Sequence, residues 1–488
     1  MNTFEPVTQK AAGSVKWSAL MEVVSRTASP IMFVILARLL TPEDFGVVSI
    51  AMIAISFSQM FWDAGLEKAL IQTKEVPEKA ADVVFWTNLV LGIVTYIILF
   101  LIAPWLVTFF NSPASMPVLR VLGLQVVIAS LTSVQQALFV RALDFRQLFW
   151  VKLATAFVPG LFSIPMAFFG YGVWSLIAGS LVGSLLNLAL LWRKSPWRPK
   201  LGFDWHIARK LFGFGIWVVG ESLAAWFFTW GDSTILGRFL GVEDLGVYRV
   251  GWTISMIIFG LLLNPFLPVL YPTFSRLQDD IHKLTETFRR ANRVVISLAL
   301  PVGVGLLLVG PHLVFVLFGN KWHGLGLVVS MLGLAQGVSW LVAINPELYR
   351  AIGRADINTK LLVIAGLCYL PVYLLAAPHG LKVFLYARLG LVFVGISIHV
   401  FFAVLLLKVS PLYLWKEGKL LILSTLVMAT VVTGLKVGLT LGAEGLPELV
   451  TLVILIMAGV MSYGGTLWLL DRPFVLQTKN LLRKVALT

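Results

Sequence analysis

The stretch Leu36–Val47 reads LARLLTPEDFGV, and Leu236–Val247 reads LGRFLGVEDLGV. Seven of the twelve positions are identical, among them Gly46 and Gly246. Further matches follow at a slightly larger offset: Leu122-Gly123-Leu124 with Leu332-Gly333-Leu334, and Leu138-Phe139 with Leu348-Tyr349. A slowly growing offset is what a duplication followed by small insertions leaves. The sequence therefore predicts two homologous halves.

Composition places the chain in a membrane. Of its 488 residues, 58% are hydrophobic and only 13% are charged, whereas soluble proteins carry about 25% charged residues. The mean hydropathy is +0.90. The single cysteine, Cys368, lies in an apolar run, so disulfides and a cysteine metal site are excluded. The net charge of +14 comes from basic residues between apolar runs, which argues against nucleic acid as a partner.

Charge-free runs indicate where the chain crosses the bilayer, because a helix needs about 20 apolar residues to span it. The run between Lys152 and Arg193 is about twice that length and contains the turn residues Phe169–Gly172. It therefore predicts a helical hairpin, and the whole chain is expected to hold about fourteen transmembrane helices. The other expected spans are Val15–Leu39, Phe45–Trp62, Val83–Ala103, Val118–Leu138, Leu211–Trp230, Val250–Leu270, Val294–Phe318, Leu325–Asn345, Leu361–Ala377, Leu389–Leu407, Leu420–Leu435 and Leu449–Leu470.

These spans predict an all-α polytopic membrane protein with two six-helix lobes and two additional C-terminal helices. Because six is even, both lobes enter the membrane from the same side and are expected to be related by a pseudo-two-fold axis. The expected parts are an N-lobe (1–192), a basic linker (193–210), a C-lobe (211–408) and the helix pair with its tail (409–488). Most lysines and arginines fall on alternate loops, which predicts that both termini are cytoplasmic.

Two polar segments are interpreted structurally. In LLTPEDFG, Thr41 can cap the next helix and Pro42 suits its first position, so the motif is expected to form an outer turn. The outer loops are short, and Gly231–Leu245 is among them. Ser275–Arg293 is interpreted as an amphipathic helix on the cytoplasmic surface, where its basic residues meet anionic membrane lipids.

Ile35–Ile50 (ILARLLTPEDFGVVSI) and Asp63–Gln72 (DAGLEKALIQ) resemble Wzx-type polysaccharide flippases of the multidrug/oligosaccharidyl-lipid/polysaccharide exporter superfamily. The likeness is to exopolysaccharide exporters of the colanic acid type. It implies a V-shaped bundle with a cationic central cavity in the bacterial inner membrane. It also implies alternating-access flipping of undecaprenyl-pyrophosphate-linked oligosaccharide repeat units for exopolysaccharide or lipopolysaccharide biosynthesis, alongside polysaccharide polymerase machinery.

Two alternatives within the superfamily stay open: an ion-coupled multidrug antiporter and a peptidoglycan-precursor flippase. By analogy with the superfamily, the two additional helices favour a lipid-linked cargo. A membrane polysaccharide polymerase is disfavoured because the outer loops are too short for a catalytic domain. The protein is therefore expected to be a transporter and not an enzyme, with no cofactor or metal site.

Charges inside the spans give the candidate site residues, because a charge at mid-helix costs roughly 2.5–3.5 kcal/mol on insertion scales. Arginine offers a planar fork that matches phosphate oxygens. The candidates for binding the pyrophosphate head are Arg26, Arg120, Arg249 and Arg388.

Glu22 and Glu221 occupy corresponding helices of the two halves. A buried carboxylate can exchange protons or Na⁺ near neutral pH, so they are candidates for coupling to H⁺ or Na⁺. The structural alternative is a salt bridge, since Glu22 and Arg26 share one helix face at i, i+4.

Overall fold

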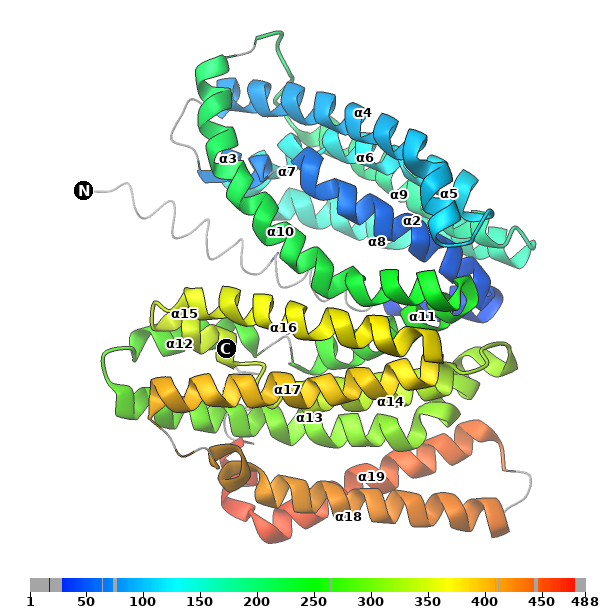
Figure 1. The fold of residues 1–488 in the computed structure, drawn as a ribbon, viewed down its shortest axis with the longest axis vertical. Helices are drawn as coiled ribbons and strands as arrows, with labels where there is room; N and C mark the ends of the chain where they lie inside the picture. The colour runs from blue at the N-terminus through cyan, green and yellow to red at the C-terminus, as the bar shows by residue number, and fades with distance from the viewer. Residues whose placement is uncertain are drawn as a thin grey trace. The chain divides into compact units, whose positions relative to one another are not determined.

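The computed structural model describes residues 17, 29–63, 65–72, 77–202, 204–263, 266–408, 410, 412–442 and 446–478. The chain forms two compact units, unit 1 (residues 1–249) and unit 2 (250–488), whose boundary falls within helix α11. All regular structure among the described residues is helical (Figure 1). This confirms the predicted all-α class.

The described residues of unit 1 form the helical stretch Ser29–Leu39 and nine further helices. They are α2 (Pro42–Asp63), α3 (Leu66–Gln72), α4 (Pro77–Phe109), α5 (Ser115–Leu122), α6 (Leu124–Ser130), α7 (Ser133–Arg141), α8 (Phe145–Phe168), α9 (Val173–Lys194) and α10 (Trp205–Leu240). The unit closes with the first two turns of α11 (Val242–Leu263).

Unit 2 contains the rest of α11 and the helices that follow it in the described chain. These are α12 (Leu267–Arg276), α13 (Ile281–Phe318), η1 (Gly319–Lys321), α14 (Leu325–Ser339), α15 (Asn345–Ala351), α16 (Ala355–Ala376), η2 (Ala377–His379), α17 (Leu381–Leu407), α18 (Tyr413–Gly442) and α19 (Glu448–Leu470).

The described residues hold ten helices that are long and apolar enough to cross a membrane. An eleventh is obtained if residues Ser115–Ser130 and Ser133–Arg141, bent by 40° where they meet, form one span. That bent pair covers the predicted span Val118–Leu138. Every expected span overlaps a helix, while the count of fourteen stays a prediction.

The two copies of the repeated motif meet inside unit 1, at the start of α2 and of α11. A Cβ placed on Gly46 would lie 1.9 Å from the carbonyl oxygen of Val242, and one on Gly246 would lie 1.8 Å from that of Pro42. The offset of 200 relates Gly46 to Gly246 and Pro42 to Val242, so the two contacts are reciprocal. Glycine is required at both positions because only a missing side chain lets the two backbones approach this closely.

The first copy begins α2 as predicted. The Thr41 hydroxyl accepts the Asp44 backbone N–H at 3.3 Å, and the Asp44 carboxylate accepts the Thr41 backbone N–H at 3.0 Å. This reciprocal pair is a capping box. In the second copy, Gly241 stands in place of Thr41 and adopts a φ of +88°, a conformation that glycine reaches without strain.

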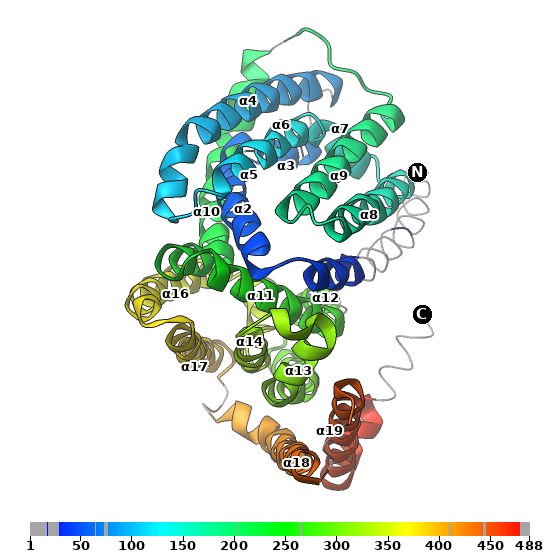
Figure 2. The same ribbon diagram turned by 90° about the vertical axis from the view of Figure 1, so that its right-hand side faces the viewer.

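The predicted hairpin is confirmed: α8 and α9 are neighbours in both views (Figures 1 and 2). The chain turns at Gly170 and Gly172, where φ is +83° and +53°. Unit 2 repeats this arrangement with α16 and α17, which join through η2 and Gly380 at a φ of +98°.

The amphipathic pattern predicted for Ser275–Arg293 is present in the structure, although the segment does not form a helix of its own. Its place on the cytoplasmic surface stays a prediction. From Ile281 onward this segment is the first part of α13, which continues without a break to Phe318. Leu284 and Phe288 are completely buried, because the apolar face that the sequence showed packs within unit 2.

Helices α18 and α19 pack on α13 through polar contacts as well as apolar ones (Figure 1). The Tyr463 hydroxyl donates to the Ser297 carbonyl at 2.8 Å. The Lys436 ammonium donates to the Leu308 carbonyl at 3.2 Å. The predicted additional pair is thus anchored to one long helix.

Candidate functional site

Three of the four candidate arginines stack on aromatic rings. The guanidinium carbons lie close to the ring centroids: Arg120 on Phe100 at 4.2 Å, Arg249 on Trp230 at 3.9 Å and Arg388 on Trp252 at 5.2 Å. A cation over a ring face is attracted by the ring quadrupole, more strongly where water is excluded. The N–H donors of a guanidinium point outward along its edge, the geometry that suits phosphate oxygens.

Arg249 belongs to a polar network at the end of α10. Its guanidinium donates to the Ser233 hydroxyl and to the Thr229 carbonyl, both at 3.4 Å. The Ser233 hydroxyl donates to Asp232 at 3.0 Å, and the Tyr248 hydroxyl donates to the other oxygen of the same carboxylate at 2.6 Å. Asp232 is buried, with 6% of its surface exposed.

This network corrects the predicted outer loop at Gly231–Leu245. Helix α10 continues through it to Leu240, and α11 begins at Val242. The polar residues Asp232 and Ser233 lie within the segment that was predicted to be a loop. Their hydrogen bonds are instead made inside unit 1, so the helix has no reason to end there.

The other two arginines have different surroundings. The Arg120 Nε is buried and has no hydrogen-bond partner among the described residues. The Arg388 guanidinium donates to the Tyr373 hydroxyl at 3.5 Å. Arg120 and Arg249 belong to unit 1, and Arg388 belongs to unit 2.

The remaining candidates are not described. Glu22 and Arg26 lie outside the described residues, and Glu221 lies in α10 with its side chain outside them. Their roles in ion coupling and head-group binding stay predictions.

A carboxylate pair that sequence reasoning missed lies where α2 meets α3. The pKa of Glu67 is raised from 4.5 to about 7, first by burial and next by the negative charge of Asp63. A hydrogen bond with Gln136 and the positive charges of Lys152 and Lys68 lower this pKa, but they do not offset the rise. One oxygen of Asp63 is buried without a partner among the described residues. Both carboxylates lie in DAGLEKALIQ. Their spacing of four residues, directly after a predicted span, is the sequence feature that could have indicated the pair.

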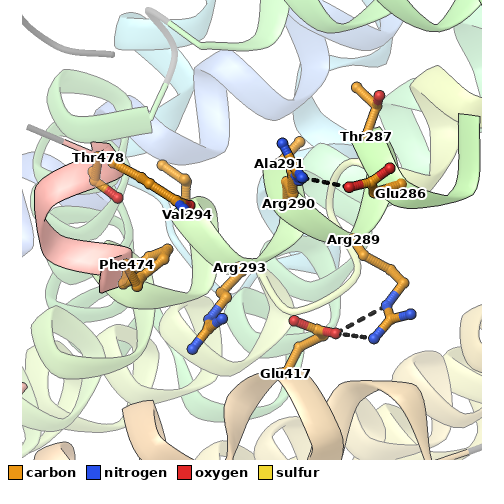
Figure 3. A pocket seen from close by; sticks show the side chains of 11 residues that line it. Glu286, Thr287, Arg289, Arg290, Ala291, Arg293, Val294, Glu417, Phe474 and Thr478 are labelled. Atoms are coloured by element: carbon orange, nitrogen blue, oxygen red, sulfur yellow. Dashed lines mark hydrogen bonds and ion pairs between the residues drawn. The ribbon is translucent and has the colours of Figure 1, made fainter. Parts of the chain in front are cut away.

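A cavity of about 810 Å³ lies at the end of unit 2 where α13 begins (Figure 3). Three arginines lie along its α13 wall, and each pairs with a carboxylate: Arg289 with Glu417, Arg290 with Glu286 and Arg293 with Asp471. Because every positive charge is balanced, the cavity is a poor anion site. The first and third pairs connect α13 to α18 and to the end of α19, which gives them a structural role.

Taken together, the apolar helices, the repeated halves and the intramembrane arginines define a multi-pass membrane protein. Residues 35–326 match the family described as "Polysaccharide biosynthesis protein". This match covers more than half of the chain, and the protein belongs to that family.

Two curated relatives are similar along most of the chain. The succinoglycan biosynthesis transport protein ExoT of Rhizobium meliloti (strain 1021) is 27% identical, with 67% of this chain and 66% of that protein covered. The lipopolysaccharide biosynthesis protein WzxC of Escherichia coli (strain K12) is 26% identical, with 74% of each chain covered.

Among solved structures, the lipid II flippase MurJ in an inward closed conformation superposes with a TM-score of 0.77. The superposition covers 94% of this chain and 100% of that one, at 14% identity. At this identity the likeness shows the fold alone, and it agrees with the predicted all-α fold of many apolar helices.

Proposed function

We propose that the protein flips polyprenyl-pyrophosphate-linked oligosaccharide repeat units across the bacterial inner membrane, by alternating access of its two halves. Family membership carries this proposal, and the names of the relatives, a transport protein and a lipopolysaccharide biosynthesis protein, support it. The proposed halves are residues 1–192 and 211–408, with both termini cytoplasmic. The protein acts as a transporter and not as an enzyme.

The stacked arginines support an anionic cargo. Arg120, Arg249 and Arg388 are proposed to contact the pyrophosphate as it passes, with Arg26 as a fourth contact. An unstacked lysine would bring charge without the two-point geometry of a guanidinium. The aromatic rings keep each guanidinium oriented while the cargo is absent.

The membrane potential supplies a driving force without ATP. Moving one charge across 100 mV is worth about 2.3 kcal/mol, so a pyrophosphate with two negative charges gains roughly 4–5 kcal/mol on leaving a negative interior. Glu22 and Glu221 are proposed to add coupling to H⁺ or Na⁺. Export that stays fully dependent on the ion gradient in both Glu→Gln variants would remove them from this role.

The test is the sidedness of the lipid-linked repeat units in cells without the protein. Flipping predicts that complete units accumulate on the cytoplasmic leaflet and that the wild-type gene restores them to the outer leaflet. Units that reach the outer leaflet but stay unpolymerised would instead indicate a polymerase. Labelling lipid II in the same cells tests the alternative that the protein flips a peptidoglycan precursor. Lipid II accumulates on the cytoplasmic leaflet of these cells only if it is the substrate.

A further inference from the structure

A second cavity, of about 280 Å³, lies within unit 1 between α2, α6 and α9. Its polar lining is uncharged and consists of Ser56, Gln59, Gln125, Thr132, Ser184 and Asn187. The indole of the buried Trp62 forms part of the wall. Because α2 and α9 are long, apolar helices suited to crossing the membrane, amides at these positions are costly unless they have hydrogen-bond partners.

Unit 2 has a cavity of about 190 Å³ between α14, α15, α16 and α17, which shares part of its lining positions with the unit 1 cavity. The correspondence follows from the repeat. Helices α8 and α16 begin at residues 145 and 355, an offset of 210, and α9 and α17 begin at 173 and 381, an offset of 208. With these offsets, four lining positions of the first cavity coincide with four of the second: Ala129 with Ser339, Thr132 with Val342, Ser184 with Val392 and Asn187 with Gly395.

The two cavities differ in chemistry. Three of the four equivalent pairs are polar in unit 1 and apolar in unit 2, and one differs in the opposite sense. The amides Gln59 and Gln125 also line only the unit 1 cavity. A lining needed only for folding in the membrane would be mostly apolar, as the unit 2 cavity is apart from Ser339, Tyr369 and His399. The polar lining of unit 1 therefore calls for another explanation.

Hydrogen bonds within the unit account for part of this lining. The Gln125 amide donates to the Ser180 hydroxyl at 2.5 Å and to the Ser184 hydroxyl at 3.3 Å. The Trp226 indole donates to the Ser56 hydroxyl at 3.0 Å. In the described part of the chain, the side-chain amides of Gln59 and Asn187 have no such partner. Each offers two donors and one acceptor toward the cavity.

We propose that this unit 1 cavity holds one uncharged sugar ring of the transported oligosaccharide and recognises its hydroxyl groups, an inference that rests on the proposed function. Amides and hydroxyls pair with sugar hydroxyls in both directions, since all of them donate and accept. The volume is just below the roughly 300–1,000 Å³ of drug-sized ligand sites, so the cavity suits one ring and not a whole repeat unit. Without a positive charge in its lining, it does not suit the pyrophosphate.

The test uses Gln59→Ala and Asn187→Ala in cells whose only copy of the protein is the variant, with Ser339→Ala in the unit 2 cavity as the matched control. Outer-leaflet labelling measures flipping of the native lipid-linked repeat unit. A hydrogen bond of ordinary strength corresponds to about a 2- to 12-fold effect. We expect each unit 1 variant to flip that much more slowly, while the control keeps the wild-type rate.

A second readout separates recognition from folding. Since Gln59 and Asn187 have no hydrogen-bond partners in the described chain, their alanine variants should keep wild-type thermal stability in detergent. Undecaprenyl-pyrophosphate that carries one hexose is the minimal probe, and its flipping should fall in the same variants.

Each contrary outcome has a distinct meaning. Wild-type flipping in both variants overturns the sugar site and leaves the proposed function intact, whereas failure of the wild-type protein to flip any lipid-linked glycan overturns the function itself. A loss of flipping accompanied by lower thermal stability assigns the amides a structural role. A loss that is restored by raising the NaCl concentration assigns the cavity to a monovalent cation. Both of these results overturn the proposal.

Discussion

Replacing Gly46 by alanine tests the reciprocal contact between the two copies of the repeated motif. The added Cβ would lie 1.9 Å from the Val242 carbonyl oxygen, whereas real Cβ contacts stay beyond 3.0 Å. The helices must therefore separate by roughly 1 Å. Overpacking of this kind costs about 1–3 kcal/mol. We expect Gly46→Ala to cost about 2–3 kcal/mol, because the obstacle is backbone that cannot rotate away.

Thermal unfolding in detergent measures this effect. A loss of 1 kcal/mol lowers the melting temperature of a unit of this size by about 2–4 °C, so the expected decrease is roughly 5–10 °C. The matched control is Gly390→Ala in α17, where nothing lies within 4 Å of the added Cβ. Alanine at an open helical position is favoured over glycine by about 1 kcal/mol, so the control should be unchanged or slightly more stable.

The double variant sharpens the test. Gly246→Ala should cost about as much as Gly46→Ala, since its Cβ would lie 1.8 Å from the Pro42 carbonyl oxygen. One separation of the helices relieves both clashes. The stability cost of the double variant should therefore be clearly smaller than the sum of the two single costs, because neighbouring sites are not additive. A neutral single substitution, or a double variant with strictly additive cost, would refute the reciprocal crossing.

Three further predictions concern charge. Because the folded pKa of Glu67 is raised from 4.5 to about 7, the stability that this carboxyl contributes is fully present below pH 4.5 and is lost as the pH rises through 7. Glu67→Gln should abolish this loss, so that its melting temperature exceeds that of the wild type at pH 8 and equals it at pH 4.5. Arg249→Lys keeps the charge but loses the planar guanidinium over the Trp230 ring, so flipping should fall by about 3- to 10-fold, equivalent to about 1 kcal/mol, and a wild-type rate would show that charge alone suffices. Arg293→Ala leaves the carboxylate of Asp471, whose side chain is 11% exposed, without its partner; thermal unfolding should show a cost of about 3 kcal/mol, and Asp471→Asn in the same chain should recover most of it if the buried charge is the cause.

Most of the long apolar helices and the hairpin could be predicted because the bilayer fixes the length of an apolar helix and glycine permits the turn at Gly170 and Gly172. The capping residues of α2 were also readable, since a cap depends on neighbours within four residues. These features are local, and their physical causes are contained in short stretches of sequence.

Features that depend on distant partners could not be predicted. The segment Gly231–Leu245 was predicted to be a loop, whereas the hydrogen bond between Asp232 and Tyr248, 16 residues further along the chain, holds Asp232 inside the fold. The unit 1 cavity was not predicted because the candidate site residues were selected as charged residues within apolar spans. Gln59, Gln125 and Asn187 are neutral and come from three separate helices. Only the folded chain brings them together.

The reciprocal glycine crossing has a consequence for how such chains diversify. Positions 42, 46, 242 and 246 form one geometric unit although two hundred residues separate its parts along the chain. A larger residue accepted at one copy is tolerable only if the facing backbone of the other copy moves away. Across homologues, these four positions should therefore vary as a correlated set, and a gene that exchanges one half for that of a distant relative should fail first at this crossing.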